Sequence, residues 1–65
     1  MKNNIKKLRK DRGITQEELA FSMKVTRQTI IALENEKYNA SLALAHKLAK
    51  YFDVKIEDIF IFEEV

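Results

Sequence analysis

The sequence predicts an all-α fold of five short helices, with a short two-stranded β element formed by the two ends of the chain. Composition is the first reason, because one glycine and no proline among 65 residues disfavour turn-rich β folds. Periodicity is the second, because apolar residues recur at helical spacing along most of the chain. The third is the Thr and Ser residues that precede these apolar stripes, where helices commonly begin. We expect residues 1–65 to form one domain.

The composition also excludes several classes of protein. Hydrophobic residues make up 46% of the chain, too many for a disordered polypeptide, and charged residues make up 34%, too many for a membrane span. A chain of this length buries only about 60% of its unfolded surface. It has no cysteine for disulfides and no Cys/His cluster for zinc, so we expect a partner to add stability. No apolar stretch of a secretory signal follows Met1, so we expect a cytoplasmic protein.

The first two helices are marked by their ends. The first is expected to begin beside Asn3 or Asn4, either of which can cap it, and to end at the chain's single glycine. Thr15 and Glu18 have the spacing of a capping box, in which each side chain accepts a hydrogen bond from the other residue's backbone N–H. The second helix is therefore expected at about residues 16–23.

The remaining helices follow similar signals. Thr26 is expected to cap a third helix, at about residues 27–35, only a few residues after the second helix ends. Residues 56–60 are expected to form a single helical turn, and the acidic residues at its start interact favourably with the helix dipole. Ser41 is expected to cap a fourth helix whose apolar face consists of Leu42, Ala45, Leu48, Ala49 and Phe52.

The end of the chain predicts association between copies. Residues 60–65 are aromatic and β-branched, and we expect them to pair as a strand with residues 1–4. A two-stranded ribbon is marginal alone, and an apolar strand edge favours association, so we expect a homodimer. The alternative is that the two phenylalanines complete the core of the monomer. The side chains assigned to the dimer interface are Phe60, Ile61 and Phe62.

Charge is distributed unevenly along the chain. Residues 1–37 hold nine Lys and Arg against five Asp and Glu, whereas residues 38–65 hold three against five. The first part could therefore face a polyanion, and the acidic end could not. The same asymmetry is compatible with an ordinary solvated surface.

Two short helices joined by a very tight turn indicate a helix-turn-helix, in which the second helix enters the DNA major groove. An αα-hairpin that binds no DNA needs the same apolar positions, so the outer face of the second helix decides more. At about 100° per residue, Ile30 and Leu33 face the core. Arg can bind guanine, Gln can bind adenine, and aliphatic groups can contact the thymine methyl. The outward positions are Arg27, Gln28, Ile31, Ala32 and Asn35.

The segments 14–20, 25–30 and 33–35 together resemble the lambda-repressor/Cro-like (XRE-type) helix-turn-helix regulators. Size and ends resemble the minimal dimeric repressors of the cytolysin-repressor type. The resemblance implies a transcriptional regulator that binds pseudo-palindromic double-stranded DNA as a homodimer. We expect this regulator to be a repressor. It implies no catalysis and no cofactor. Base contacts are expected from the recognition-helix matches Arg27, Gln28, Thr29 and Ala32, and from the outward-facing Ile31.

The resemblance also implies contacts outside the recognition helix. Arg9 and Glu34 match a partly buried ion pair between the first and third helices, and both lie on apolar faces where an unpaired charge is costly. Lys24 and Glu36 depart from the family pattern, because each stands where glycine is common. A positive φ at Lys24 would cost of order 1 kcal/mol. Phosphate contacts are expected from Gln16, Thr26, Asn35, Lys37 and Asn39.

Three other functions remain open at the level of sequence. An antitoxin of a toxin–antitoxin pair would also bind DNA, and a protein-interaction adaptor could keep the fold without binding DNA. A second regulatory protein could be a partner of either a repressor or an antitoxin. An enzyme is the remotest option, because no nucleophile–base pair or cofactor motif is present. His46 stands alone, without the Cys or second His that a metal site needs.

Overall fold

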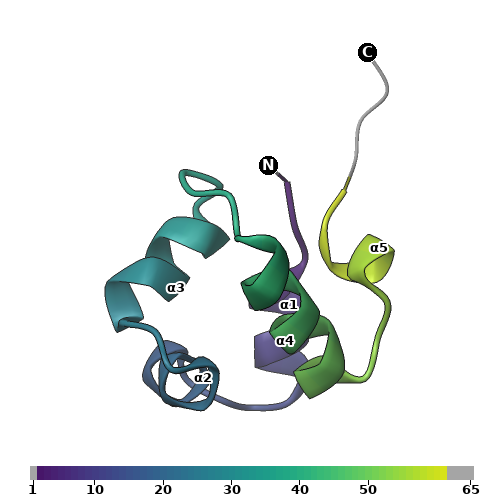
Figure 1. Ribbon diagram of the computed structural model, residues 1–65. Helices are drawn as coiled ribbons and strands as arrows, with labels where there is room; N and C mark the ends of the chain where they lie inside the picture. The colour runs from purple at the N-terminus through teal and green to yellow at the C-terminus, as the bar shows by residue number, and fades with distance from the viewer. Residues whose placement is uncertain (1, 62–65) are drawn as a thin grey trace.

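The computed structural model describes residues 2–61 and has five α-helices in the predicted order (Figure 1). Helices α2 and α3 pack directly against each other, and α4 contacts both α2 and α5. The all-helical part of the predicted fold is confirmed. The helices are α1 (Ile5–Asp11), α2 (Gln16–Met23), α3 (Arg27–Glu34), α4 (Leu42–Phe52) and α5 (Ile56–Ile59).

Every helix contributes to one apolar core. Leu42 was expected on the buried face of α4, but its side chain is 81% exposed, and Leu44 is buried instead. The reason is geometric: Leu42 is the first residue of α4 and is rotated about 90° from the middle of the buried face at 100° per residue. The largest fully buried side chains are Ile5, Leu19, Ile30, Leu33, Leu48 and Ile59.

The predicted caps of α2, α3 and α4 are confirmed by hydrogen bonds, whereas Asn4 at the start of α1 makes no such bond. Thr15 Oγ1 accepts the Glu18 N–H at 3.0 Å, and a Glu18 carboxylate oxygen accepts the Thr15 N–H at 2.9 Å, which completes the capping box. Thr26 caps α3 and Ser41 caps α4 through the same kind of bond. These caps satisfy backbone donors that the first turn of a helix leaves without a partner.

Four helices end in one common motif. After α1, α2, α3 and α4, a residue with positive φ donates its N–H three residues back, and the next residue donates five residues back. Only the first of these turns contains glycine. The left-handed positions are Gly13 (φ 68°), Lys24 (60°), Glu36 (62°) and Asp53 (55°). Lys24 therefore has the positive φ whose cost was considered above, and the turn after α4 adds a third left-handed residue that is not glycine.

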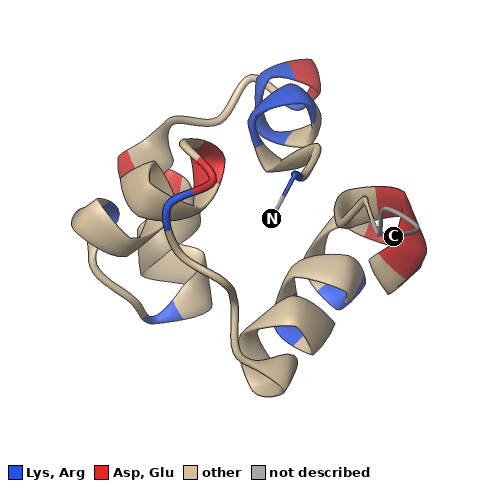
Figure 2. Cartoon of the chain, turned by 90° about the horizontal axis from the view of Figure 1, so that it is seen from above, with Lys and Arg blue, Asp and Glu red and all other residues tan. Residues whose placement is uncertain are grey.

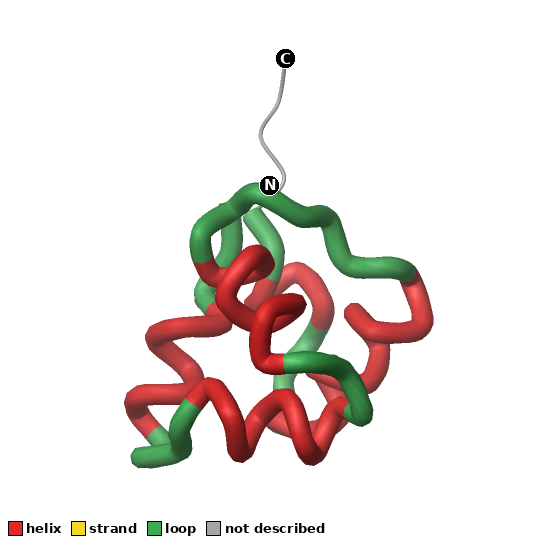
Figure 3. Tube along the Cα trace, turned by 90° about the vertical axis from the view of Figure 1, so that its left-hand side faces the viewer, coloured by secondary structure: helices red, strands yellow, loops and turns green. Residues whose placement is uncertain are grey.

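The predicted terminal two-stranded β element is wrong. Among residues 2–61 the structure has no strand (Figure 3), and the two ends meet at one isolated antiparallel bridge between Asn3 and Phe60. The Asn4 N–H donates to the Ile59 oxygen at 2.7 Å, and the Ile61 N–H donates to the Lys2 oxygen at 2.9 Å. Among the described residues only 2–4 precede α1 and only 60 and 61 follow α5, and these short segments form a single bridge rather than a ladder. Met1 and residues 62–65 lie outside the described residues.

Candidate nucleic-acid interface

The outer surface of α3 begins with two exposed polar side chains. Arg27 and Gln28 are both exposed in the first turn, whereas Ile31 and Ala32 in the second turn are half-buried. Thr29 is half-buried, and its Oγ1 lies 3.0 Å from the Thr26 Oγ1, so its hydroxyl is engaged within the helix start. The N-terminal half of α3 therefore offers the most accessible hydrogen-bonding groups.

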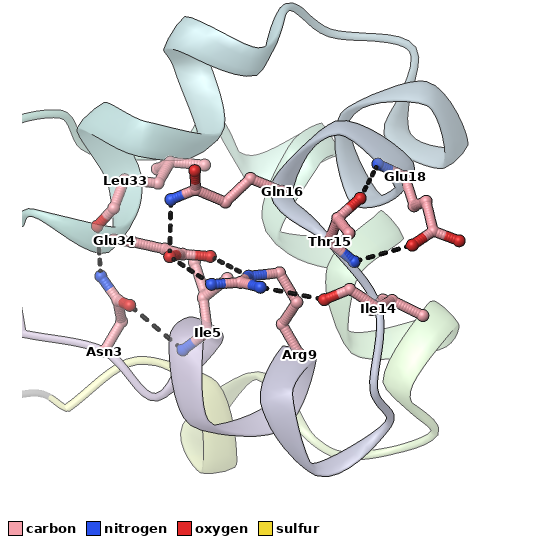
Figure 4. Close-up of polar contacts among 9 residues, drawn as sticks. All are labelled: Asn3, Ile5, Arg9, Ile14, Thr15, Gln16, Glu18, Leu33 and Glu34. Carbon is pink, nitrogen blue, oxygen red and sulfur yellow. Dashed lines mark hydrogen bonds and ion pairs between the residues drawn. The ribbon is translucent and has the colours of Figure 1, made fainter.

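The only acidic residue of α3 points away from this surface. The Glu34 side chain is 2% exposed, and its Oε2 lies 2.7 Å from Arg9 Nε (Figure 4). Arg9 Nη2 donates to Glu34 Oε1 at 3.2 Å, and Arg9 Nη1 donates to the Ile14 oxygen at 2.9 Å. The hydrogen bond that Arg9 donates to Glu34 raises the pKa of Arg9, so the guanidinium stays charged although Arg9 is buried. Pairing thus removes a carboxylate from the face of α3 that carries Arg27.

Gln16 connects this ion pair to the start of α2. Its Nε2 donates to Glu34 Oε1 at 3.1 Å, which places the N-terminus of α2 beside the C-terminus of α3 (Figure 4). The free backbone N–H groups at a helix N-terminus favour an anion at this position. The geometry therefore brings Gln16 to the edge of the surface that the outer face of α3 forms.

The other expected phosphate contacts lie at both ends of α3. Thr26 is the exposed cap at its start, and Asn35, Lys37 and Asn39 are exposed in the segment that follows its end. Glu36 lies among the latter, in the left-handed turn. Polar side chains therefore flank α3 on two sides, as a helix seated in a groove between two phosphate backbones requires.

Charge is segregated between the first and last helices. Helix α1 carries Lys6, Lys7 and Lys10 at exposed positions, and α5 carries Glu57 and Asp58 in its first turn. Figure 2 shows blue gathered on the helix next to the N label and red on the helix next to the C label. The acids of α5 are therefore separate from the lysines of α1, while α2 carries two further exposed acids, Glu17 and Glu18.

The polar contacts of Arg12 and Asn3 were not predicted from the sequence. Arg12 donates to the main-chain oxygens of Tyr51 (3.2 Å) and Phe52 (2.8 Å), and thereby ties α1 to the end of α4. Asn3 donates to the Leu33 oxygen at 2.8 Å. Both bonds join residues at least 30 positions apart, and no local spacing signals them. A general chemical rule could have pointed to such bonds, because cationic and amide side chains commonly donate to the carbonyls at helix ends that lack intrahelical partners.

The residues expected at the dimer interface differ in their surroundings. Phe60 is 3% exposed and belongs to the core of its own chain, whereas Ile61 is 43% exposed. Phe62 lies outside the described residues. Of the side chains that are described, Ile61 is the one that offers apolar surface next to the bridge between the ends.

None of the helices within residues 2–61 is long and apolar enough to cross a membrane. In the same part of the chain, no group of three or more His, Cys, Asp or Glu side chains is placed to hold a metal ion.

A capped helix followed after a tight turn by a second helix with an exposed Arg–Gln face defines a helix-turn-helix protein. The chain belongs to the helix-turn-helix family, whose model matches residues 5–59. It is 58% identical over 64 residues to an uncharacterized HTH-type transcriptional regulator of Methanocaldococcus jannaschii, with 98% of this chain and 97% of the relative covered. It is 48% identical over 64 residues to the uncharacterized HTH-type transcriptional regulator YgzD of Bacillus subtilis, with the same coverage.

A solved structure supports the same assignment. The fold matches the restriction-modification controller protein C.AhdI from Aeromonas hydrophila with a TM-score of 0.78 and 32% identity, over 88% of this chain and 86% of that one. The predicted resemblance to XRE-type regulators is confirmed. The chain is a DNA-binding transcriptional regulator of the helix-turn-helix family and not an enzyme.

Proposed function

We propose that this regulator is a repressor that binds pseudo-palindromic double-stranded DNA as a homodimer and places α3 in the major groove. The observation that carries the proposal is the orientation of charge on α3. Arg27 and Gln28 are exposed, while the only carboxylate of the helix, on Glu34, is buried against Arg9. The outer face is therefore neutral to positive, which suits a groove bounded by phosphates.

The base contacts are assigned to the outer residues of α3. Arg27 makes paired hydrogen bonds with guanine, Gln28 makes them with adenine, and Ile31 and Ala32 contact thymine methyl groups. Thr29 contributes at the margin of this surface. The phosphate contacts come from both ends of the helix and from the start of α2, through Gln16, Thr26, Asn35, Lys37 and Asn39.

Two copies of the chain associate beside the bridge between the ends, where Ile61 is exposed. In a two-fold dimer the recognition helices lie about 34–36 Å apart and meet half-sites one turn of DNA apart. A dimer seated across its site blocks access by other proteins, which is the physical basis for repression.

Selection of bound sites from random duplex DNA tests the proposal. The intact chain should enrich two-fold symmetric sites, and Arg27→Ala or Gln28→Ala should weaken binding by about 1–3 kcal/mol at particular base pairs. Lys47→Ala, an exposed substitution on α4, serves as the matched control and should keep the sequence preference. If both α3 variants keep the full preference, the assignment of the recognition helix is wrong.

The same experiment separates the proposed repressor from other functions. A protein-interaction adaptor would give no sequence-specific complex whose affinity falls with salt. An antitoxin would bind DNA as well, but expression of the gene beside it would arrest growth unless this chain were present. If binding to the selected site activates transcription rather than blocking it, the proposed repression is overturned and the proposed DNA recognition stands.

Sedimentation of the intact chain and of a chain truncated after Phe60 tests the dimer. We expect the intact chain to be dimeric at micromolar concentration and the truncated chain to be shifted toward monomer. Phe21→Ser is the matched control, because Phe21 is an apolar side chain on α2 that is 86% exposed. An intact chain that stays monomeric, or a truncated chain that stays fully dimeric, would remove the terminal segment from the interface.

A further inference from the structure

Asn3 joins the two ends of the chain to the recognition helix. Its backbone forms the antiparallel bridge with Phe60, and its side-chain Nδ2 donates to the main-chain oxygen of Leu33 at 2.8 Å. Its Oδ1 accepts the Ile5 N–H at 3.2 Å, so both ends of the amide are held (Figure 4). A single side chain thereby connects the terminal segment, the start of α1 and the last turn of α3.

The bond to Leu33 acts at the last turn of α3. The last carbonyls of a helix lack intrahelical partners, so donors from the following turn and from other segments help to position this turn. The Leu33 oxygen accepts the Glu36 N–H at 3.1 Å from within its own turn and the Asn3 amide from 30 residues away. The partly buried Asn3 bond therefore orients the end of α3 relative to the terminal bridge.

We propose that Asn3 is a positioning residue that sets how the recognition helix is oriented relative to the terminal segment, and so determines which half-site spacing the protein accepts. This inference rests on the proposed homodimer at the terminal segment. In such a dimer the path from one α3 to the other runs through the terminal bridge of each subunit. Asn3 lies on that path, because its backbone is paired opposite Phe60 between the two hydrogen bonds of the bridge, and its side chain donates to α3.

The spacing between two half-sites sets both their distance and their relative rotation, because DNA is helical. Adding one base pair between half-sites moves the second half-site by about 3.4 Å and rotates it by about 35° around the DNA axis. A firmly held recognition helix discriminates strongly against such a shift. A helix whose last turn has lost the Asn3 bond follows such a shift more readily, although Glu34 stays paired with Arg9, and then binds the wrong spacing with less loss of affinity.

Asn4 supplies a matched control next door. Its Nδ2 donates to the Asp58 oxygen at 3.1 Å, so it ties the same terminal segment to α5 and makes no hydrogen bond to α3. Asn4→Asp and Asn3→Asp each remove one amide donor and add one negative charge at neighbouring positions. In Asn3→Asp one oxygen can still accept the Ile5 N–H, while the other replaces the donor to Leu33 and repels its carbonyl oxygen.

The experiment compares affinities for a single half-site and for palindromes with the preferred spacing, one base pair less and one base pair more. Asn3→Asp should lower the ratio between preferred and altered spacings by about fivefold, the size of one partly buried hydrogen bond, and keep the half-site sequence preference. Asn4→Asp should leave the ratio within about twofold of the intact chain. Asn3→Ala, which adds no charge, should lower the ratio as Asn3→Asp does. Circular dichroism identifies any variant that is unfolded. If one of the two Asn3 variants is unfolded, the other one tests the inference.

The outcomes separate this inference from the proposed function. If the intact chain prefers one spacing but the folded Asn3 variants keep the same ratio, the inference is overturned and the dimeric recognition stands. An equal loss in Asn4→Asp overturns it as well, because the effect would then come from charge or from the terminal segment in general. If the intact chain shows no preference among spacings, the proposed dimeric recognition fails and takes the inference with it.

Discussion

The Gln16 amide and the Arg9 guanidinium share one carboxylate oxygen, because both donate to Glu34 Oε1, at 3.1 Å and 3.2 Å. A nearly buried acid of α3 therefore holds a side chain from each of α1 and α2. The bond fixes the direction of the Gln16 amide and leaves its second N–H and its oxygen for other partners. A residue proposed to contact DNA is thus oriented by the same ion pair that joins the helices.

Gln16→Ala and Lys37→Ala should both weaken binding to all DNA sequences to a similar extent, because phosphate contacts carry no sequence information. Their salt dependence should differ. Lys37→Ala should reduce the slope of log affinity against log salt by about 0.9, because one fewer counterion is released. Gln16→Ala should leave the slope unchanged, since Gln16 is neutral. Titration at several salt concentrations measures both quantities, and a loss confined to one base pair would contradict the phosphate role.

Removing either partner of the Arg9–Glu34 pair should lower the free energy of unfolding by about 3 kcal/mol or more, because an unpaired charge remains in a buried position. The side chains are 10% and 2% exposed, so solvent screens the pair little. A double-mutant cycle of Arg9→Ala and Glu34→Ala in urea measures the coupling, with a stabilising osmolyte added if single variants are unfolded. Coupling near zero would show that the pair does not stabilise the fold.

Lys24→Gly should raise the free energy of unfolding by about 0.5 kcal/mol, because relief of the left-handed strain exceeds the added entropy of the unfolded chain. Lys24 has a φ of 60° at the end of α2. Gly13→Ala is the converse substitution and should lower stability by about 1 kcal/mol. No atom lies within 4 Å of the added Cβ at Gly13, so its effect reports the backbone alone. Thermal unfolding of both variants checks the pair, and two changes of the same sign would contradict the account.

Arg12→Ala should lower the free energy of unfolding by about 1 kcal/mol, a value reduced from that of a buried charged bond because Arg12 is exposed. The guanidinium donates to two carbonyls at the end of α4, and it lies 5.4 Å from the centre of the Phe52 ring. Lys6→Ala on the exposed face of α1 is the control and should change stability by less than about 0.5 kcal/mol. Urea unfolding of the two variants gives the comparison, and equal losses would assign the effect to charge alone.

The helices could be predicted because their signals are local. Thr15, Thr26 and Ser41 each lie directly before an apolar stripe, and each cap forms within three residues. The terminal strand was predicted on the β propensity of its residues, which depends on having a partner strand of sufficient length. The helix that begins at Ile5 leaves only residues 2–4 of the described chain to pair with residues 60 and 61, and propensity carries no information about that limit.

The surface of α3 could be predicted by helical rotation alone, and Arg27 and Gln28 are exposed as their positions require. The hydrogen bonds from Asn3 to Leu33 and from Gln16 to Glu34 could not. They join residues 30 and 18 positions apart, and their partners are brought together only when α1, α2 and α3 pack. The residues next to Asn3 and Gln16 in the sequence carry no pattern that predicts such long-range bonds.

The bridge between Asn3 and Phe60 also bears on the order of folding. Closing a loop costs entropy that grows with its length, and this contact closes almost the whole chain, whereas α2 and α3 meet across a few residues. We therefore expect the bridge to form after the helix-turn-helix and to open before it. Each opening would release the last turn of α3 from the Asn3 amide while all five helices stay folded, so the bridge amides of Asn4 and Ile61 should exchange faster than the amides in the middle of α3.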